Sequence, residues 1–182
     1  DEGGNLIDPY GGMEDIKNKL LKSVSTSFDE DPLRVLRVAR FASKLKFLDF
    51  KIEKKTLELM KKISSSGEIE TLSKERVWME TYKALSTRNP EEYFSILLKV
   101  GALEKICQSI NLNLKALEKT SSDTQDCAIK WSVLISENEN IEEINISFNA
   151  PKEFSEISGI CRHINLFSSK KISPESLMDL IN

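Results

Sequence analysis

The sequence predicts an all-α protein. Only seven of its 182 residues are glycine and five are proline. Several long segments repeat apolar residues at the three- and four-residue spacing of a helix that packs on a core. Apolar residues make up 40% of the chain and charged residues 30%, which is an ordinary composition for a globular protein. We therefore expect one or two helical domains with a buried core.

The central periodic segment runs from Phe28 to Phe47 and reads FDEDPLRVLRVARFASKLKF. Asp31 fits the N-cap position, and Pro32 fits the first helical position, where its missing N–H costs nothing. One face of the predicted helix carries the apolar residues Val35, Val38, Ala39, Ala42 and Leu45. The opposite face carries Arg34, Arg37, Arg40 and Lys44, with Phe41 among them. We expect the first face to be buried and the second to be exposed.

Asp31 and Arg34 are three residues apart and are therefore neighbours on a helix. A carboxylate can accept from the exocyclic amine of a base, while a guanidinium donates to a ring nitrogen or a carbonyl oxygen. Cytosine and adenine both present an amine beside an acceptor, whereas guanine and uracil present other patterns. The same two residues could instead serve as a helix cap and a surface ion pair, so the spacing alone leaves both interpretations open.

Three stretches resemble, in order and spacing, the bacterial class II tRNA nucleotidyltransferases, which are the CCA-adding enzymes. They are EDPLRVLRVARFA from Glu30, IDPYGGMEDI from Ile7, and LSKERVWMET from Leu72, which LSTRNPEEYF and KVGAL follow. The resemblance covers about residues 5–106. It implies nucleotide binding by Glu30, Asp31, Arg34 and Arg37, tRNA contacts by Arg40 and Lys44, and a flexible loop that includes Asp8 and Gly12. It also matches Glu75 and Arg76 to a pair that we expect to brace the central helix.

The resemblance implies an enzyme that adds CCA to tRNA 3′ ends from CTP and ATP with Mg²⁺. In that family the carboxylates that bind the metal lie in a head domain, in a G-G…R-D pattern followed by D-x-D, and this combination does not occur here. We therefore expect no catalytic residue and no metal ligand in this chain, which would be inactive alone. Because the chain begins at Asp1, just before the first motif, we expect it to be part of a longer protein that contains the head.

The segments before the central helix predict the end of a strand at residues 5–8, a loop at 9–12, and a helix from Glu14 to Leu21. In that helix we expect Ile16, Leu20 and Leu21 to point inward. After the central helix, the apolar spacing predicts a helix from Lys54 to Ile63. Ser73 fits the N-cap of a helix from Lys74 to Leu85.

Asn89 and Pro90 start the next predicted helix, in which Phe94, Leu97 and Leu98 form the buried side and Gly101 the C-cap. Further helices are expected at residues 112–119, 124–136, 151–164 and 174–181. In the third of these, one stripe holds Phe154, Ile157, Cys161 and Ile164.

We divide the chain into three parts: the end of the head and a linker (1–27), a helical neck (28–106) and a degenerate or truncated helical body (107–182). In some relatives the body carries a metal-dependent phosphohydrolase that contains a His-Asp pair. The sequence has a single histidine, His163, so that site cannot be assembled in its usual form. We expect His163 at the surface or half-buried.

Charge and cysteine content limit the possible partners and locations. The formal net charge of −3 argues against a generally basic nucleic-acid coat, so an RNA contact requires a local basic patch. The three cysteines lie at wide spacings without a C-x-x-C motif, as expected for reduced thiols in a cytoplasmic protein. No apolar run approaches the ~20 residues of a membrane helix.

Two alternative functions remain open at this stage. Bacterial poly(A) polymerase has a similar central motif, although the LSKERVWMET and TRNPEEYF stretches resemble the CCA-adding branch more closely. A non-catalytic helical adaptor could bind RNA or protein through the arginine face without any affinity for free nucleotides.

Overall fold

A computed structural model describes residues 7–24, 28 and 30–164 in full and the backbone of residues 165–169. This part of the chain is mainly α-helical, and the one sheet within it has two strands of two residues each. The predicted all-α class is confirmed.

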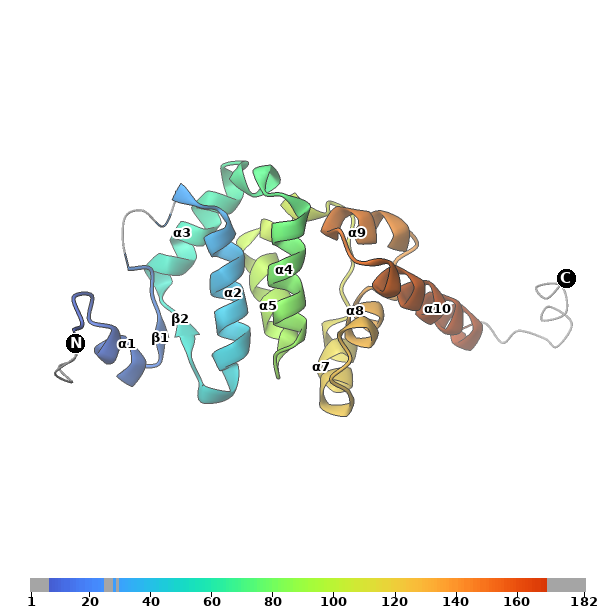
Figure 1. Ribbon diagram of the computed structural model, residues 1–182, viewed down its shortest axis with the longest axis horizontal. Coiled ribbons are helices and arrows are strands. Elements are labelled where there is room, and N and C mark those ends of the chain that lie inside the picture. Colours follow the sequence, from blue (N-terminus) through green and yellow to red (C-terminus); the bar gives the residue numbers. More distant parts are fainter. Residues whose placement is uncertain (1–6, 25–27, 29, 170–182) are drawn as a thin grey trace, which may run out of the picture.

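The elements within these residues have the following bounds. In chain order they are α1 (Gly12–Lys17), β1 (Leu20–Leu21), α2 (Leu33–Leu45), the 3₁₀ helix η2 (Lys46–Leu48), β2 (Lys51–Ile52), α3 (Lys54–Ser65), the 3₁₀ helix η3 (Glu68–Thr71), α4 (Lys74–Leu85), α5 (Pro90–Val100), α6 (Ala102–Ile106), α7 (Leu114–Asp123), α8 (Cys127–Ile135), α9 (Ile141–Phe148) and α10 (Lys152–Ser169). Helices α2, α4 and α5 lie side by side in the middle of the molecule (Figure 1). Helix α1 and the sheet lie toward one end, and α7–α10 lie toward the other.

Helix α2 packs through its apolar face against α4 and α5. Val35, Ala39 and Ala42 of the predicted face are buried, while Val38 and Leu45 are half-buried. Leu36, which we did not place on this face, is also completely buried. Because burial of apolar side chains supplies most of the favourable free energy of packing, this face fixes which side of α2 looks outward.

The hydrophobic core continues from α2 to α10 without a break. Trp131 of α8 is completely buried, and its ring meets Trp78 of α4 edge-to-face at 5.5 Å between centroids. Phe154 of α10 packs on the same Trp78 ring at 4.8 Å. The core therefore crosses residue 106, where we place a domain boundary; the division into three parts remains a prediction.

The predicted ends of α4 and α5 are confirmed. The Ser73 hydroxyl accepts the Arg76 N–H at 3.4 Å and caps α4, which spans the predicted residues. Pro90 occupies the first turn of α5, and Gly101 ends it with φ at 75°. That left-handed conformation is one that glycine adopts without the steric penalty of a Cβ atom.

The N-terminal region differs from the prediction. Helix α1 ends at Lys17, after which the chain turns through Lys19 at φ 55° and enters β1. Strand β1 pairs in parallel with β2, with Leu20 opposite Lys51. Two-residue strands have no periodicity that a sequence could reveal. The predicted helix from Glu14 to Leu21 is therefore wrong in its second half.

Three residues that we expected to be buried are exposed. Ile16 is 61% exposed, Leu98 44% and Ile164 56%. In α5 Tyr93 is completely buried, and its phenol lies 3.1 Å from the Thr81 hydroxyl, which satisfies its hydrogen-bonding group. Helix α9 was not predicted. Residues 7 and 8 of the predicted strand end do not form a strand. Residues 5 and 6 of that prediction and the predicted helix at 174–181 lie outside the described residues.

Within the described residues, no helix is both long enough and apolar enough to cross a membrane.

Asn145 provides a test of the core between α8, α9 and α10. Its side-chain oxygen accepts the indole N–H of Trp131 at 2.8 Å, and its amide donates to the Ser158 hydroxyl at 3.1 Å. We expect Asn145→Ala to lower the free energy of unfolding by ~1–3 kcal/mol, because it leaves a buried indole N–H without an acceptor. Urea unfolding followed by tryptophan fluorescence measures this change.

The neighbouring Ile146, which is 66% exposed, supplies the matched control. Ile146→Ala should change the unfolding free energy by less than ~0.5 kcal/mol. Equal effects of the two substitutions would contradict the role of Asn145.

Candidate nucleic-acid interface

The start of α2 is held by an ion pair with α4. Arg76 Nη2 lies 3.1 Å from Asp31 Oδ1 and 2.9 Å from Oδ2. Asp31 Oδ1 also accepts the backbone N–H of Leu33 at 3.0 Å. The predicted bracing of the central helix by Arg76 is confirmed, whereas the predicted helix start is displaced by one residue, because Pro32 rather than Asp31 occupies the N-cap position. Since the Asp31 side chain remains 32% exposed, it can still reach a ligand.

The other predicted nucleotide-binding residues lie around Asp31. Glu30 is exposed immediately before it, Arg34 is half-buried in the first turn of α2, and Arg37 is exposed one turn further. The structure thus brings a carboxylate and two guanidinium-bearing residues to one end of one helix. Such a set offers hydrogen-bond acceptors and planar donors to one small planar ligand.

Arg40 does not lie on the exposed face that we predicted for it. Its guanidinium Nε is 2.5 Å from Glu80 Oε2 on α4, and the two side chains are only 14% and 7% exposed. The Arg40 side chain lies on the side of α2 that faces α4, where the nearly buried carboxylate of Glu80 neutralises its charge. A buried guanidinium needs such a partner, because an unpaired charge in the interior is very costly.

The C-terminal end of α2 is fixed to α5 and to the turn before it. The Ser43 hydroxyl donates to the Asn89 carbonyl at 2.9 Å. The Lys46 ammonium lies 3.0 Å from Glu91 and 2.9 Å from Glu92. Both acids lie in the first turn of α5, where negative charge is favourable. Their contact with Lys46 was missed, because nothing in the spacing links positions that are 45 residues apart.

The predicted loop residues Asp8 and Gly12 contact each other directly. Asp8 Oδ1 accepts the Gly12 N–H at 2.7 Å, and Oδ2 accepts the Met13 N–H at 2.9 Å. These bonds cap α1, and the hydrogen bond from Met13, followed by that from Gly12, lowers the pKa of Asp8. Gly11, at φ 74°, makes the turn that brings the two together. The flexibility predicted for this loop remains a prediction.

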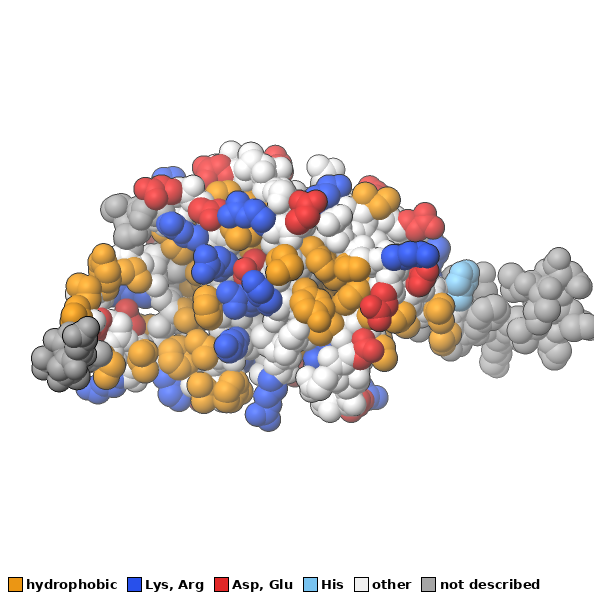
Figure 2. Space-filling model, in the orientation of Figure 1, with side chains coloured by type: hydrophobic (Ala, Val, Ile, Leu, Met, Phe, Trp, Pro, Cys, Tyr) orange, Lys and Arg blue, Asp and Glu red, His pale blue; other side chains and the backbone are white. Residues whose placement is uncertain are grey.

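A group of basic side chains runs down the middle of the face shown in Figure 2, with hydrophobic side chains on both sides. It overlies α2 and α4 as they lie in Figure 1. Among the predicted residues of α2, Arg37 and Lys44 are exposed. The chain as a whole is acidic, so contact with nucleic acid would require a local basic patch, and this surface is one.

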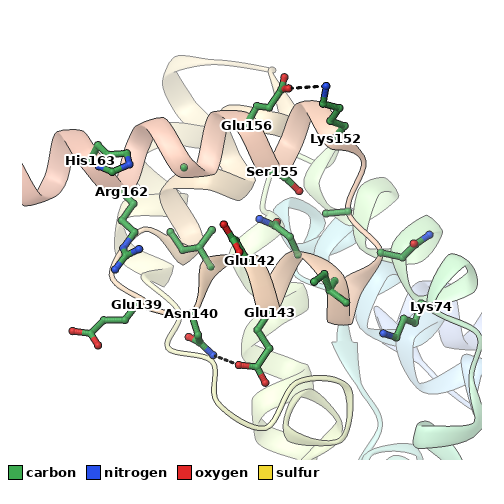
Figure 3. Close-up of a pocket in the computed structure, with 16 residues that line it drawn as sticks. Lys74, Glu139, Asn140, Glu142, Glu143, Lys152, Ser155, Glu156, Arg162 and His163 are labelled. Atoms are coloured by element: carbon green, nitrogen blue, oxygen red, sulfur yellow. Dashed lines mark hydrogen bonds and ion pairs between the residues drawn. The ribbon is translucent and has the colours of Figure 1, made fainter. Parts of the chain in front are cut away.

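A pocket of about 1090 Å³ lies between α9 and α10, with Lys74 of α4 at its edge (Figure 3). Side chains of both signs line it, including Glu142, Glu143 and Arg162. His163 is exposed on α10 beside Arg162, as predicted. None of the predicted site residues lines this pocket, and its mixed charge does not select an anion or a cation. We therefore place the candidate site on α2.

No group of three or more His, Cys, Asp or Glu side chains in the described part of the chain could hold a metal ion. Cys107, Cys127 and Cys161 are free thiols, of which Cys107 is buried and the other two are half-buried.

Comparison with known proteins finds similarity to proteins of CCA addition and to an RNA-binding family. A family described as "Probable RNA and SrmB-binding site of polymerase A" matches residues 49–112, which include α4 but not α2. The CCA-adding enzyme of Actinobacillus succinogenes is 61% identical over 103 residues, which are 57% of this chain and 26% of that protein. The multifunctional CCA protein of Haemophilus influenzae is 39% identical over 182 residues, covering 97% of this chain and 41% of that protein.

The chain is also similar to a solved structure. That structure is of a tRNA nucleotidyltransferase complexed with a primer tRNA and an incoming ATP analog. Its TM-score is 0.73 at 27% identity, covering 92% of this chain and 53% of that chain. The chain therefore spans about half, or less, of the length of the proteins that it matches.

The lowered pKa of Asp8 gives a prediction about pH. A carboxylate whose pKa is depressed in the folded state stabilises that state above its unfolded pKa, and the stabilisation is lost as the pH falls through the lower, folded pKa. We expect the amide NMR signals of Gly12 and Met13 to titrate with a midpoint below the ordinary value of 3.8. This titration should be absent in Asp8→Asn. A midpoint at or above the ordinary value would contradict the capping role.

Proposed function

We propose that this chain is the base-selecting and RNA-binding part of a cytoplasmic tRNA nucleotidyltransferase. That enzyme would add CCA to tRNA 3′ ends from CTP and ATP. The similarity to a multifunctional CCA protein over nearly the whole chain supports this proposal. The observation that carries the proposal is the Asp31 carboxylate. Arg76 holds it three residues, or nearly one helical turn, before Arg34, the first arginine on the outer face of α2.

Base selection by Asp31 and Arg34 follows from their hydrogen-bonding capacity. The two carboxylate oxygens of Asp31 offer about four lone-pair sites. Arg76 and the Leu33 N–H occupy three of them and leave one on Oδ2. That site would accept the exocyclic amine of cytosine or adenine, while Arg34 donates to the adjacent ring nitrogen or carbonyl oxygen. Guanine and uracil would place a donor or an acceptor opposite a group of the same kind.

The neighbouring charges extend this site. Glu30 adds a second carboxylate beside Asp31, and Arg37 would support the nucleotide or hold Asp31 in position. Lys44, exposed near the end of α2, would contact tRNA phosphates. Because Glu80 holds Arg40 in a nearly buried ion pair, we assign Arg40 to the positioning of α2 rather than to direct contact with tRNA.

The Mg²⁺ that nucleotidyl transfer requires would be held by carboxylates in the head, outside this chain. This chain would then bind and orient the substrates and would not transfer nucleotides alone. Its partners would be the head, tRNA, CTP and ATP.

Two other functions are less well supported. Poly(A) polymerase fits the description of the matching family, but the two curated relatives compared above are a CCA-adding enzyme and a multifunctional CCA protein. A non-catalytic adaptor would not need an oriented carboxylate beside a guanidinium.

The test is nucleotide incorporation by the full-length protein into tRNA that lacks CCA. With CTP and ATP, we expect addition of two C residues and one A. Arg34→Ala should reduce the discrimination of CTP and ATP against GTP and UTP by ~1–3 kcal/mol, the contribution of one bidentate contact to a base. The ratio of kcat/KM values for single nucleotides measures it.

Arg162→Ala, on α10, is the control and should leave this ratio unchanged. Unaltered selectivity of Arg34→Ala would refute the assignment of Arg34. A long A tail made from ATP alone would favour poly(A) polymerase, and salt-dependent tRNA binding without affinity for free nucleotides would favour an adaptor.

A further inference from the structure

One exposed aromatic residue of α2 has no role in base selection. Phe41 is 39% exposed and lies on the same stripe of the helix as Arg34, Arg37 and Lys44, at successive spacings of three, four and three residues. Residues with this spacing share one face of an α-helix. Ten residues of helix rise about 15 Å, so the stripe leads from the proposed base-selecting residues along the surface of α2.

The Phe41 ring is held in place from one side. The Arg40 guanidinium carbon lies 4.4 Å from the centre of the ring. Arg40 itself is fixed by its ion pair with Glu80 on α4. A ring that is already ordered loses little conformational freedom when a ligand stacks on it, which favours binding. A single exposed apolar side chain needs no explanation, but an ordered ring between cations on a basic surface has the composition of a site for unpaired nucleotides.

Charge supports RNA as the occupant of this stripe. Arg37 precedes Phe41 by one helical turn and Lys44 follows it by three residues, and both are exposed. Sites for single-stranded nucleic acid combine cations along the sugar-phosphate backbone with aromatic rings on which bases stack. A peptide or a second copy of this chain would need acidic groups placed to match these cations, whereas RNA supplies the matching charge through its own phosphates.

We propose that Phe41 is a stacking platform for an unpaired base at the 3′ end of the RNA substrate, with Arg37 and Lys44 on the adjacent phosphates. The inference rests on the proposed function for the identity of the RNA. Two tasks would then be separated along α2. The first turn of the helix would select the incoming nucleotide, and the middle of the helix would hold the 3′ end of the RNA to which that nucleotide is added.

The test compares the full-length protein with its Phe41→Ala variant in binding two tRNA primers. One primer lacks CCA, and the other is the same RNA with its 3′-terminal base removed. For the first primer, loss of the ring should raise the Kd about 5- to 140-fold, which corresponds to the stacking of one base. For the abasic primer, the two proteins should bind with the same Kd. Fluorescence anisotropy measures these constants without catalysis.

Further variants separate stacking from structural damage. Phe41→Leu keeps an apolar side chain without an aromatic face and should behave like Phe41→Ala, while Phe41→Trp should retain tight binding. Ile160→Ala, an exposed apolar position on α10, should change neither Kd. Lys44→Gln should weaken binding of both primers equally and reduce the salt dependence.

Unchanged primer binding by Phe41→Ala would overturn the proposal, and so would an equal loss for the two primers. Failure of the proposed function is a separate outcome, because it would appear as absence of CMP and AMP addition by the unmodified full-length protein. In that case the binding measurement would still decide whether Phe41 stacks on a terminal base.

Discussion

Two hydrogen bonds between the Arg76 guanidinium and the Asp31 carboxylate tie the segment just before α2 to the first turn of α4. An ion pair as exposed as this one contributes about 0–1 kcal/mol to stability, so its importance is geometric. The buried pair of Arg40 and Glu80 joins the same two helices further along, and Lys46 reaches α5 at the far end. Rotation of α2 about its axis would break all three contacts. They therefore help to keep the same face of the helix exposed.

The later helices fix α4, which in turn fixes α2. Trp78 of α4 is enclosed by Trp131 of α8 and Phe154 of α10, both in edge-to-face contact. The completely buried Lys130 of α8 donates to the carbonyl of Leu85, the last residue of α4. Carbonyl groups at the C-terminal end of a helix lack partners within the helix and carry partial negative charge, so a lysine there satisfies both needs. The helices beyond residue 107 therefore support the surface that α2 presents.

Local signals in the sequence predicted the parts of the fold that depend on neighbouring residues. Ser73 and the Asn89-Pro90 pair mark helix starts through caps that act within one turn, and α4 and α5 begin where they indicate. Arg40 shows where this reasoning fails. Its angular position suggested an exposed cation, but Glu80, 40 residues away, gives it a buried partner. The pairing of β1 with β2 was missed for the same reason, since it joins residues about 30 positions apart that carry no periodic pattern.

The central claim is that Asp31 and Arg34, fixed by the docking of α2, form hydrogen bonds with the edge of the incoming base. A crystal structure of the full-length protein with bound CTP tests it most directly. The account predicts that Asp31 Oδ2 accepts from the cytosine amine while Arg76 keeps its contact with the carboxylate, and that Arg34 donates to the ring nitrogen or the carbonyl oxygen of the base. A cytosine bound away from the start of α2, with Asp31 in contact only with Arg76 and Leu33, would contradict the account.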